Sequence, residues 1–145
     1  MPISEYRVVP GRGLHPLLFG MTGEQVSRVM SEQPEVSKSR SLPSEEVWRF
    51  PLSNARLSMR DGVLVEVSVT PPADVRFEGQ SLFENDEGWR SLVALDGGEE
   101  EAVGFLVLRN LGLALSGLHE GEVEQRAITA FEKGRWDCLF TQTPR

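Results

Sequence analysis

The residues of this chain that could do chemistry are few and scattered. His15 and His119 are its only histidines, and Cys138 is its only cysteine. A zinc site needs several His or Cys ligands at suitable spacing, and a cysteine nucleophile needs a histidine brought close by folding. His119 has Glu120 and Glu122 beside it but no second histidine or cysteine, so we expect a solvated loop. We therefore predict no catalytic residue, no cofactor and no metal.

Carboxylates are plentiful, and a pair of them could serve as general acid and base. The sequence does not single out such a pair among its 22 Asp and Glu residues. Glu24, Asp86 and Glu87 have a structural reason to stand at helix starts, because they favour the positive end of the helix dipole. A small enzyme with a carboxylate pair in a sheet-lined cleft is thus an alternative. It requires a concave pocket with two convergent carboxylates of perturbed pKa.

The middle of the chain is strongly acidic, and we predict that it contributes to a protein-binding surface. The formal net charge is −7 and the sequence pI is about 4.9. This charge repels nucleic-acid phosphates and would steer a partner with a basic surface. The predicted partner-binding residues are Glu84, Asp86, Glu87, Asp96, Glu99, Glu100, Glu101, His119, Glu120 and Glu122. For each residue taken singly, a solvated charge is the alternative.

The length of 145 residues predicts a single domain, spanning 1–145. No apolar run approaches the roughly 20 residues that cross a bilayer, and the first residues lack the basic and apolar parts of a secretory signal. A lone cysteine cannot form an internal disulfide, which fits a reducing compartment. We therefore expect a cytoplasmic protein without a membrane partner.

Hydrophobic periodicity predicts an α+β fold, in which a mainly antiparallel sheet has two helices packed on one face. Thr22 is a good N-cap, and Gln25 stands three residues on, as in a capping box. Val26, Val29 and Met30 then recur at the spacing of one buried helical stripe.

A second helix is predicted where the same apolar spacing recurs from Trp89. It would be capped by Asn85 or Asp86 and terminated at Gly97 and Gly98.

Alternating apolar residues predict the strands. The clearest follows a hairpin turn at Asp61-Gly62 and would place Val63, Val65, Val67 and Val69 on the core face. The predicted strands are 6–9, 46–52, 55–60, 63–69, 74–79, 103–108, 111–116, 127–132 and 136–141, with a loop at 37–44 and a central position for 103–108.

The order helix, strand, turn, strand occurs twice along the chain. It suggests pseudo-repeat halves at 1–72 and 73–145. The halves match in pattern rather than in residue identity, so duplication is a hypothesis.

One stretch of the chain resembles a known family. Residues 13–26, Gly-Leu-His-Pro-Leu-Leu-Phe-Gly-Met-Thr-Gly-Glu-Gln-Val, resemble the opening of small bacterial immunity proteins encoded beside secreted toxins. Residues 110–114 and 127–134 look similar to the later part of those proteins. The Gly-Met-Thr helix start followed by strands is also similar to the fold shared by the outer-membrane assembly lipoprotein BamE and the β-lactamase inhibitor protein, which is tandem in the inhibitor.

The resemblance implies a non-catalytic immunity protein. Such a protein binds the effector domain of a cognate toxin, as in interbacterial competition by type VI secretion, and neutralises it in the cytoplasm. The family carries no catalytic residue to transfer, and the lipidated cysteine of BamE has no counterpart here because Cys138 is at the other end. A ligand-binding or assembly module without a toxin is a further alternative.

Overall fold

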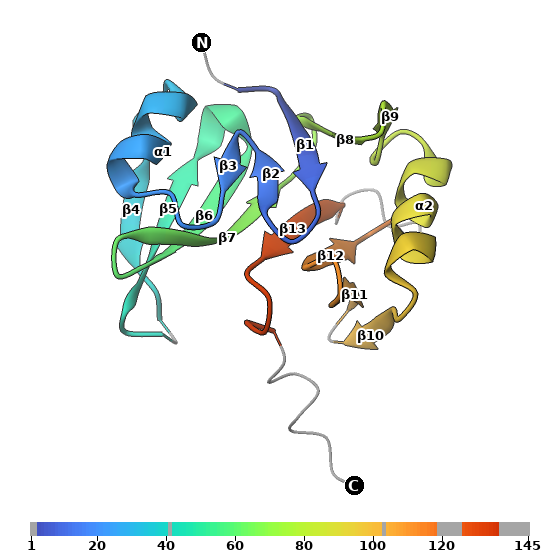
Figure 1. The fold of residues 1–145 in the computed structure, drawn as a ribbon. Coiled ribbons are helices and arrows are strands. Elements are labelled where there is room, and N and C mark those ends of the chain that lie inside the picture. Colours follow the sequence, from blue (N-terminus) through green and yellow to red (C-terminus); the bar gives the residue numbers. More distant parts are fainter. Residues whose placement is uncertain (1–2, 41, 103, 119–125, 137–145) are drawn as a thin grey trace, which may run out of the picture.

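In the computed structural model of this protein, residues 3–40, 42–102, 104–118 and 126–136 are described. Over these residues the fold is α+β and mainly antiparallel, with two α-helices, an eight-stranded sheet and a five-stranded sheet (Figure 1). Among the strand pairs of the described residues, β1 (Glu5–Val9) and β8 (Asp74–Phe77) are the parallel pair.

The larger sheet consists of two four-stranded antiparallel meanders that meet at its centre. The strand order is β10-β11-β12-β13-β7-β6-β5-β4, so β7 pairs with β13 in the middle, and β4 and β10 form the edges. Its strands are β4 (Glu35–Lys38), β5 (Glu45–Phe50), β6 (Ala55–Arg60), β7 (Val63–Val69), β10 (Glu100–Ala102), β11 (Phe105–Leu108), β12 (Leu113–Ser116) and β13 (Ala127–Phe131).

The smaller sheet has the order β3-β2-β1-β8-β9. Figure 1 shows it between α1 and α2, which lie at opposite sides of the molecule. A short 3₁₀ turn, η1, follows β5. These remaining elements are β2 (Gly13–His15), β3 (Leu17–Leu18), β9 (Gln80–Ser81), α1 (Gly23–Met30), α2 (Asp86–Asp96) and η1 (Pro51–Ser53).

One main hydrophobic core joins these layers. It contains Leu57 and Leu115 from the two meanders, Leu14 from the smaller sheet, and Met30 and Leu92 from the two helices. Burial of such side chains away from water is the main force that holds the elements together. Because side chains alternate along a strand, one face of the larger sheet is committed to this core and the other is left for different contacts.

Both predicted helices are confirmed. In α1 the Thr22 hydroxyl accepts a hydrogen bond from the Gln25 amide (3.3 Å), and the Gln25 side chain accepts one from the Thr22 amide (2.9 Å). In α2 the Asn85 side chain caps the first turn, and Gly97 ends the helix in the left-handed region at φ 70°. Buried Trp89 helps to anchor this second helix.

The predicted face of β7 is partly wrong, because the β6–β7 pair has an irregular register. The turn at Asp61 and Gly62 forms as expected, but the register shifts between Ser58 and Met59. Met59 consequently pairs with Leu64. Leu64, and not Val65, therefore joins Val67 and Val69 in the main core, and Val63 is only half-buried.

Other strand predictions also need correction. The segment 37–44 was expected to be a loop, but residues 37 and 38 belong to β4. The strand expected at 103–108 begins at Phe105 and lies next to the edge strand β10 instead of at the centre. Trp136 lies in a turn, and the rest of the strand expected at 136–141 falls outside the described residues.

Gly112 provides a test of how tightly β12 and β13 are joined. Its φ is 71°, and an added Cβ would lie 2.7 Å from the Phe131 carbonyl oxygen. Gly62 has a similar φ of 83° but no atom within 4 Å, so it is a matched control. We expect Gly62→Ala to lower the free energy of unfolding by about 1–2 kcal/mol through strain alone. Gly112→Ala should lower the free energy of unfolding by about 3 kcal/mol or more, because the added Cβ also clashes with the Phe131 carbonyl oxygen. Equal losses in urea unfolding would contradict this close approach.

Candidate binding face

The open face is the side of the eight-stranded sheet that points away from the main core. One row of directly paired residues crosses it from edge to edge and changes in character on the way. Charged side chains occupy the first three positions, two hydroxyls follow, then two small apolar residues, and a carboxylate ends the row. In order these residues are Glu35, Arg49, Arg56, Ser68, Thr129, Ala114, Val107 and Glu100.

A hollow of about 540 Å³ lies on the open face. The first meander contributes charged and polar walls, including Arg49, Arg56 and Glu66. The second contributes Phe105, and Trp136 follows it in the chain. The hydroxyls of Ser68 and Thr129, which also line the hollow, are hydrogen-bonded to each other at 3.0 Å. The hollow therefore spans the boundary between a polar half and an apolar half of the sheet.

Phe105, Phe131 and Trp136 form an aromatic cluster on the apolar half. The Trp136 ring stacks on Phe131, with centroids 4.9 Å apart and planes 13° apart. Phe105 meets the same ring edge-on at 5.2 Å. The Trp136 Nε1 donates a hydrogen bond to Glu66 Oε1 at 2.8 Å. The indole is thus held from two directions, by ring packing and by a polar bond to the other meander.

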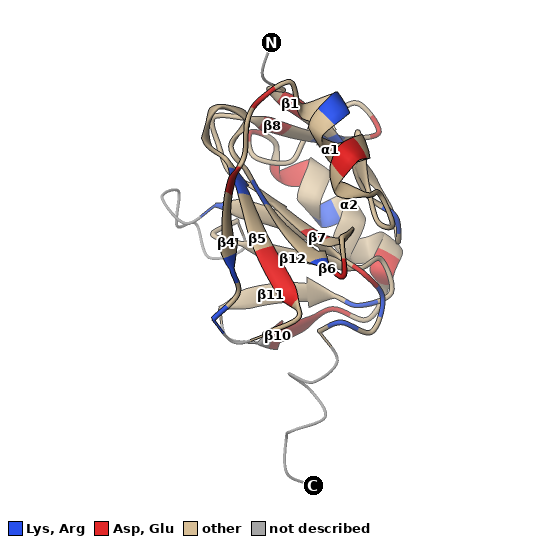
Figure 2. Ribbon diagram, turned by 90° about the vertical axis from the view of Figure 1, so that its left-hand side faces the viewer, with Lys and Arg blue, Asp and Glu red and all other residues tan. Residues whose placement is uncertain are grey.

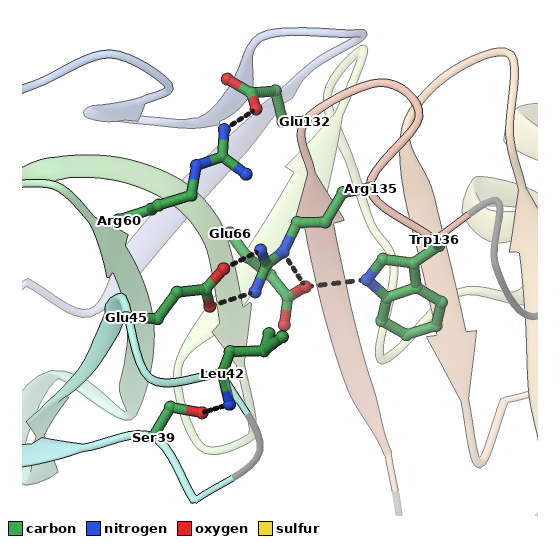
Figure 3. A network of polar contacts seen from close by, with 8 residues as sticks. All are labelled: Ser39, Leu42, Glu45, Arg60, Glu66, Glu132, Arg135 and Trp136. Atoms are coloured by element: carbon green, nitrogen blue, oxygen red, sulfur yellow. Dashed lines mark hydrogen bonds and ion pairs between the residues drawn. The ribbon is translucent and has the colours of Figure 1, made fainter.

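Arg135 is the centre of a buried ion-pair network, which we call the arginine clamp (Arg135, Glu45 and Glu66). Its Nη1 and Nη2 donate to the two Glu45 carboxylate oxygens at 2.6 and 2.7 Å, and its Nε donates to Glu66 at 2.9 Å (Figure 3). Only 12% of the Arg135 side chain is exposed, compared with 5% for Glu45 and 14% for Glu66. This two-pronged geometry matches a carboxylate and fixes the chain after β13 against β5 and β7.

The clamp favours the ionised form of Glu45. Hydrogen bonds from Arg135 lower the pKa of Glu45 below its ordinary value, outweighing the burial that would raise it. The same contacts raise the pKa of Arg135. A general acid needs a raised carboxyl pKa and a free proton. Both Glu45 oxygens accept hydrogen bonds from Arg135, and Glu66 Oε1 accepts one from Arg135 and one from Trp136, so the geometry is that of a structural network.

The acidic residues predicted to bind a partner are spread over separate elements (Figure 2). Glu84, Asp86 and Glu87 are exposed around the start of α2. Asp96, at the end of the same helix, is buried with 6% exposure. Its carboxylate accepts hydrogen bonds from the amides of Gly98 and Leu111, so it has a structural role.

The remaining predicted residues do not complete a patch. Glu99 is exposed after α2. Glu100 and Glu101 are neighbours in β10 and therefore point to opposite faces, with Glu100 on the open face and paired with Arg109 at 2.9 Å. His119, Glu120 and Glu122 lie outside the described residues. Of the predicted residues that the structure describes, Glu100 is the one that belongs to the open face.

The sequence interpretation missed the clamp and the arginines of the hollow. The signal was the polar side of the alternation in β6 and β7, where Arg56, Glu66 and Ser68 interrupt the apolar residues. This pattern marks one face of the sheet as polar. It does not show that Arg135 would reach that face from the end of β13.

Comparison with known proteins finds no matching family model, no matching curated protein and no matching solved structure. Within the described ranges, no group of three or more His, Cys, Asp or Glu residues could hold a metal ion. None of the helices in this part of the chain is long and apolar enough to cross a membrane.

Removing the Arg135 side chain should destabilise the protein strongly. We expect Arg135→Ala to lower the free energy of unfolding by about 2–4 kcal/mol, because two buried carboxylates lose their counter-charge. Arg28→Ala is the control, since Arg28 makes an exposed pair within α1; it should cost less than about 0.5 kcal/mol. Chemical denaturation measures both. Similar losses in the two variants would show that the clamp contributes little.

The clamp should also make stability depend on pH. The folded-state pKa of Glu45 lies below its ordinary value of 4.5. Its contribution is therefore present above pH 4.5 and is lost as the pH falls through the folded-state pKa. We expect the free energy of unfolding to fall more steeply below this value in the wild type than in Glu45→Gln. Denaturant titrations at a series of pH values test this, and parallel curves would contradict it.

Proposed function

We propose that this protein is a non-catalytic immunity protein that binds a cognate secreted bacterial toxin through its open face and neutralises it. The observation that carries the proposal is the composition of the hollow on that face. Exposed arginines and a supported aromatic cluster lie together there, on one side of an otherwise well-packed sheet. Protein interfaces are enriched in arginine and large aromatic residues, which supply most of the binding energy.

The rigidity of the open face favours binding. Trp136 is stacked on Phe131 and bonded to Glu66, and the clamp fixes the backbone next to it. A side chain that is already ordered loses little conformational freedom when a partner covers it. The aromatic cluster is therefore suited to act as a preorganised anchor.

We propose a toxin as the partner because residues 13–26 resemble the opening of immunity proteins. The partner would be the effector domain of a toxin encoded beside this protein, met in the cytoplasm and blocked at its active site. A net charge of −7 would accelerate the approach of a basic effector domain by long-range attraction. The exposed acidic residues around α2 would contribute to this attraction without making the central contacts.

The scaffold supports the idea of a tandem repeat with both helices on the core face. The order α1-β4-β5-β6-β7 recurs as α2-β10-β11-β12-β13, and the last strands of the two series pair at the centre. Val26 and Met30 of α1 and Trp89 and Leu92 of α2 all join the main core. A repeat of this kind leaves the opposite sheet face free to bind a partner.

A second candidate function is the binding of a small ligand. The hollow of about 540 Å³ falls within the usual range for such sites, roughly 300–1,000 Å³. An enzyme is less well supported by the open face, because Glu45 and Glu66 are both engaged by Arg135.

The proposal is tested by mixing the protein with the effector domain encoded by the adjacent gene. We expect a stable complex and loss of toxicity on co-expression. Thr70 lines the hollow and is exposed, so Thr70→Arg should weaken binding by at least about tenfold, a cost typical of a truncated or blocked contact at an interface centre. Ser27→Arg adds the same charge at an exposed position of α1 and should change affinity less than about twofold.

The association rate should also fall as the salt concentration rises from about 50 to about 500 mM, because salt screens the attraction. Absence of a complex would reject the proposed function. A complex that Thr70→Arg and Ser27→Arg weaken equally would reject the open face as the binding surface. Binding of a small metabolite in the hollow, without a protein partner, would favour the second candidate.

A further inference from the structure

We infer that Arg49 and Arg56 form an anchor within the hollow for a carboxylate side chain of the partner. A nearby apolar side chain of the same partner segment packs on the aromatic cluster. This inference rests on the proposed function and states which chemistry the open face recognises.

The two arginines are placed side by side without a counter-charge between them. They are directly opposite each other on β5 and β6, both are exposed, and both line the hollow. Within the described part of the chain, Arg49 makes one side-chain hydrogen bond, to the Ser37 hydroxyl at 3.2 Å, and the Arg56 side chain makes none. Like charges directly opposite on a sheet repel each other. A bound carboxylate would relieve this repulsion.

The nearby carboxylates do not neutralise the pair. Glu35 is opposite Arg49 on β4 but forms no ion pair with it among the described residues. Glu66 lines the hollow, yet its Oε1 is taken by Arg135 and Trp136.

Several other arginines among the described residues are paired with carboxylates. Arg60 pairs with Glu132 at 2.8 Å, and Arg76 pairs with Asp74 at 2.9 Å. The chain has 22 acidic and 15 basic residues, so carboxylates are not scarce. The hollow is thus a locally basic site in an acidic protein, and its charge complements an acidic group.

The surroundings favour a side chain of a protein over a free anion. Arg56 on β6 and Thr129 on β13 are separated by the single strand β7. Neighbouring strands lie about 4.8 Å apart and Phe131 is two residues further along β13 than Thr129, so Arg56 and the Phe131 end of the aromatic cluster are about 12 Å apart. An extended chain rises about 3.3 Å per residue, so an acidic and an apolar side chain two to four residues apart reach both places.

A guanidinium pair also suits a carboxylate by geometry. Each arginine presents a planar fork of N–H donors that can bind both carboxylate oxygens at once. Such charge-assisted hydrogen bonds are roughly twice as strong as neutral ones. Glutamine in place of the partner's glutamate would keep the size of the side chain but lose the charge-assisted hydrogen bonds.

The test needs no toxin and uses the full chain with a defined probe. The capped peptide acetyl-Gly-Glu-Ser-Phe-Gly-amide and its glutamine analogue are titrated into ¹⁵N-labelled protein. The signals followed are the arginine Nε–H groups and the Trp136 indole N–H. We expect saturable shifts of both kinds of signal with the glutamate peptide at about 1–10 mM, the affinity of a few weak contacts. The glutamine peptide should bind at least about fivefold more weakly.

Matched variants separate the anchor from general surface charge. Arg49→Gln and Arg56→Gln together should remove the preference for the glutamate peptide. Arg28→Gln, at an exposed position of α1, should leave this preference unchanged. The anchor would be overturned if the wild type bound both peptides equally or bound neither. It would also be overturned if the double variant kept the preference for the glutamate peptide. Sodium sulfate that shifts the arginine signals more strongly than the peptide, without moving the Trp136 signal, would assign the pair to small oxyanions and overturn it as well.

The outcomes distinguish this inference from the proposed function. A toxin that binds the wild type and the Arg49→Gln/Arg56→Gln variant equally would leave the immunity function intact and remove the anchor. A selective response to the glutamate peptide, with no complex formed by the neighbouring toxin, would retain the anchor and reject the immunity function.

Discussion

The antiparallel pairing of β7 with β13 is the interaction on which the rest of the structure depends. It joins two meanders that are each built from local hairpins, and it brings together Ser68 and Thr129, which are 61 residues apart in the chain. The pair contributes to both faces, since Val67 and Ala130 face the core while the two hydroxyls bond on the open face. Contacts between distant segments have a high entropic cost, so this pairing needs support from both sides of the sheet.

The central position of β13 explains the character of the open face. The chain leaves β13 in the middle of the sheet, so Arg135 and Trp136 emerge above strands of both meanders. Arg135 reaches Glu45, 90 residues away, and Trp136 reaches Glu66, 70 residues away. The clamp thereby fixes the short segment after β13 across the boundary between the polar and apolar halves. The hollow has arginines on one side and aromatic rings on the other because the segment after β13 lies across this boundary.

Local features of the fold could be predicted from the sequence, and long-range ones could not. The cap at Thr22, the turn at Asp61-Gly62 and the end of α2 at Gly97 each depend on a few neighbouring residues. The parallel pairing of β1 with β8 and the clamp depend on segments that only the complete fold brings together. The acidic residues of the middle segment looked like one surface because they are close in sequence. Yet an 11-residue helix is about 16 Å long and separates them, and Asp96 is needed inside to bind backbone amides.

The two edge strands of the larger sheet limit how another chain can approach it. β4 has four residues and β10 has three, and both carry charged side chains, including Lys38 and Glu101. Short and charged edges discourage the backbone pairing that leads to fibrils and to strand exchange. The proposed recognition would therefore use side chains on a face whose backbone hydrogen bonds are already made. Substitutions on the open face would then alter its chemistry during evolution while the framework that carries them is retained.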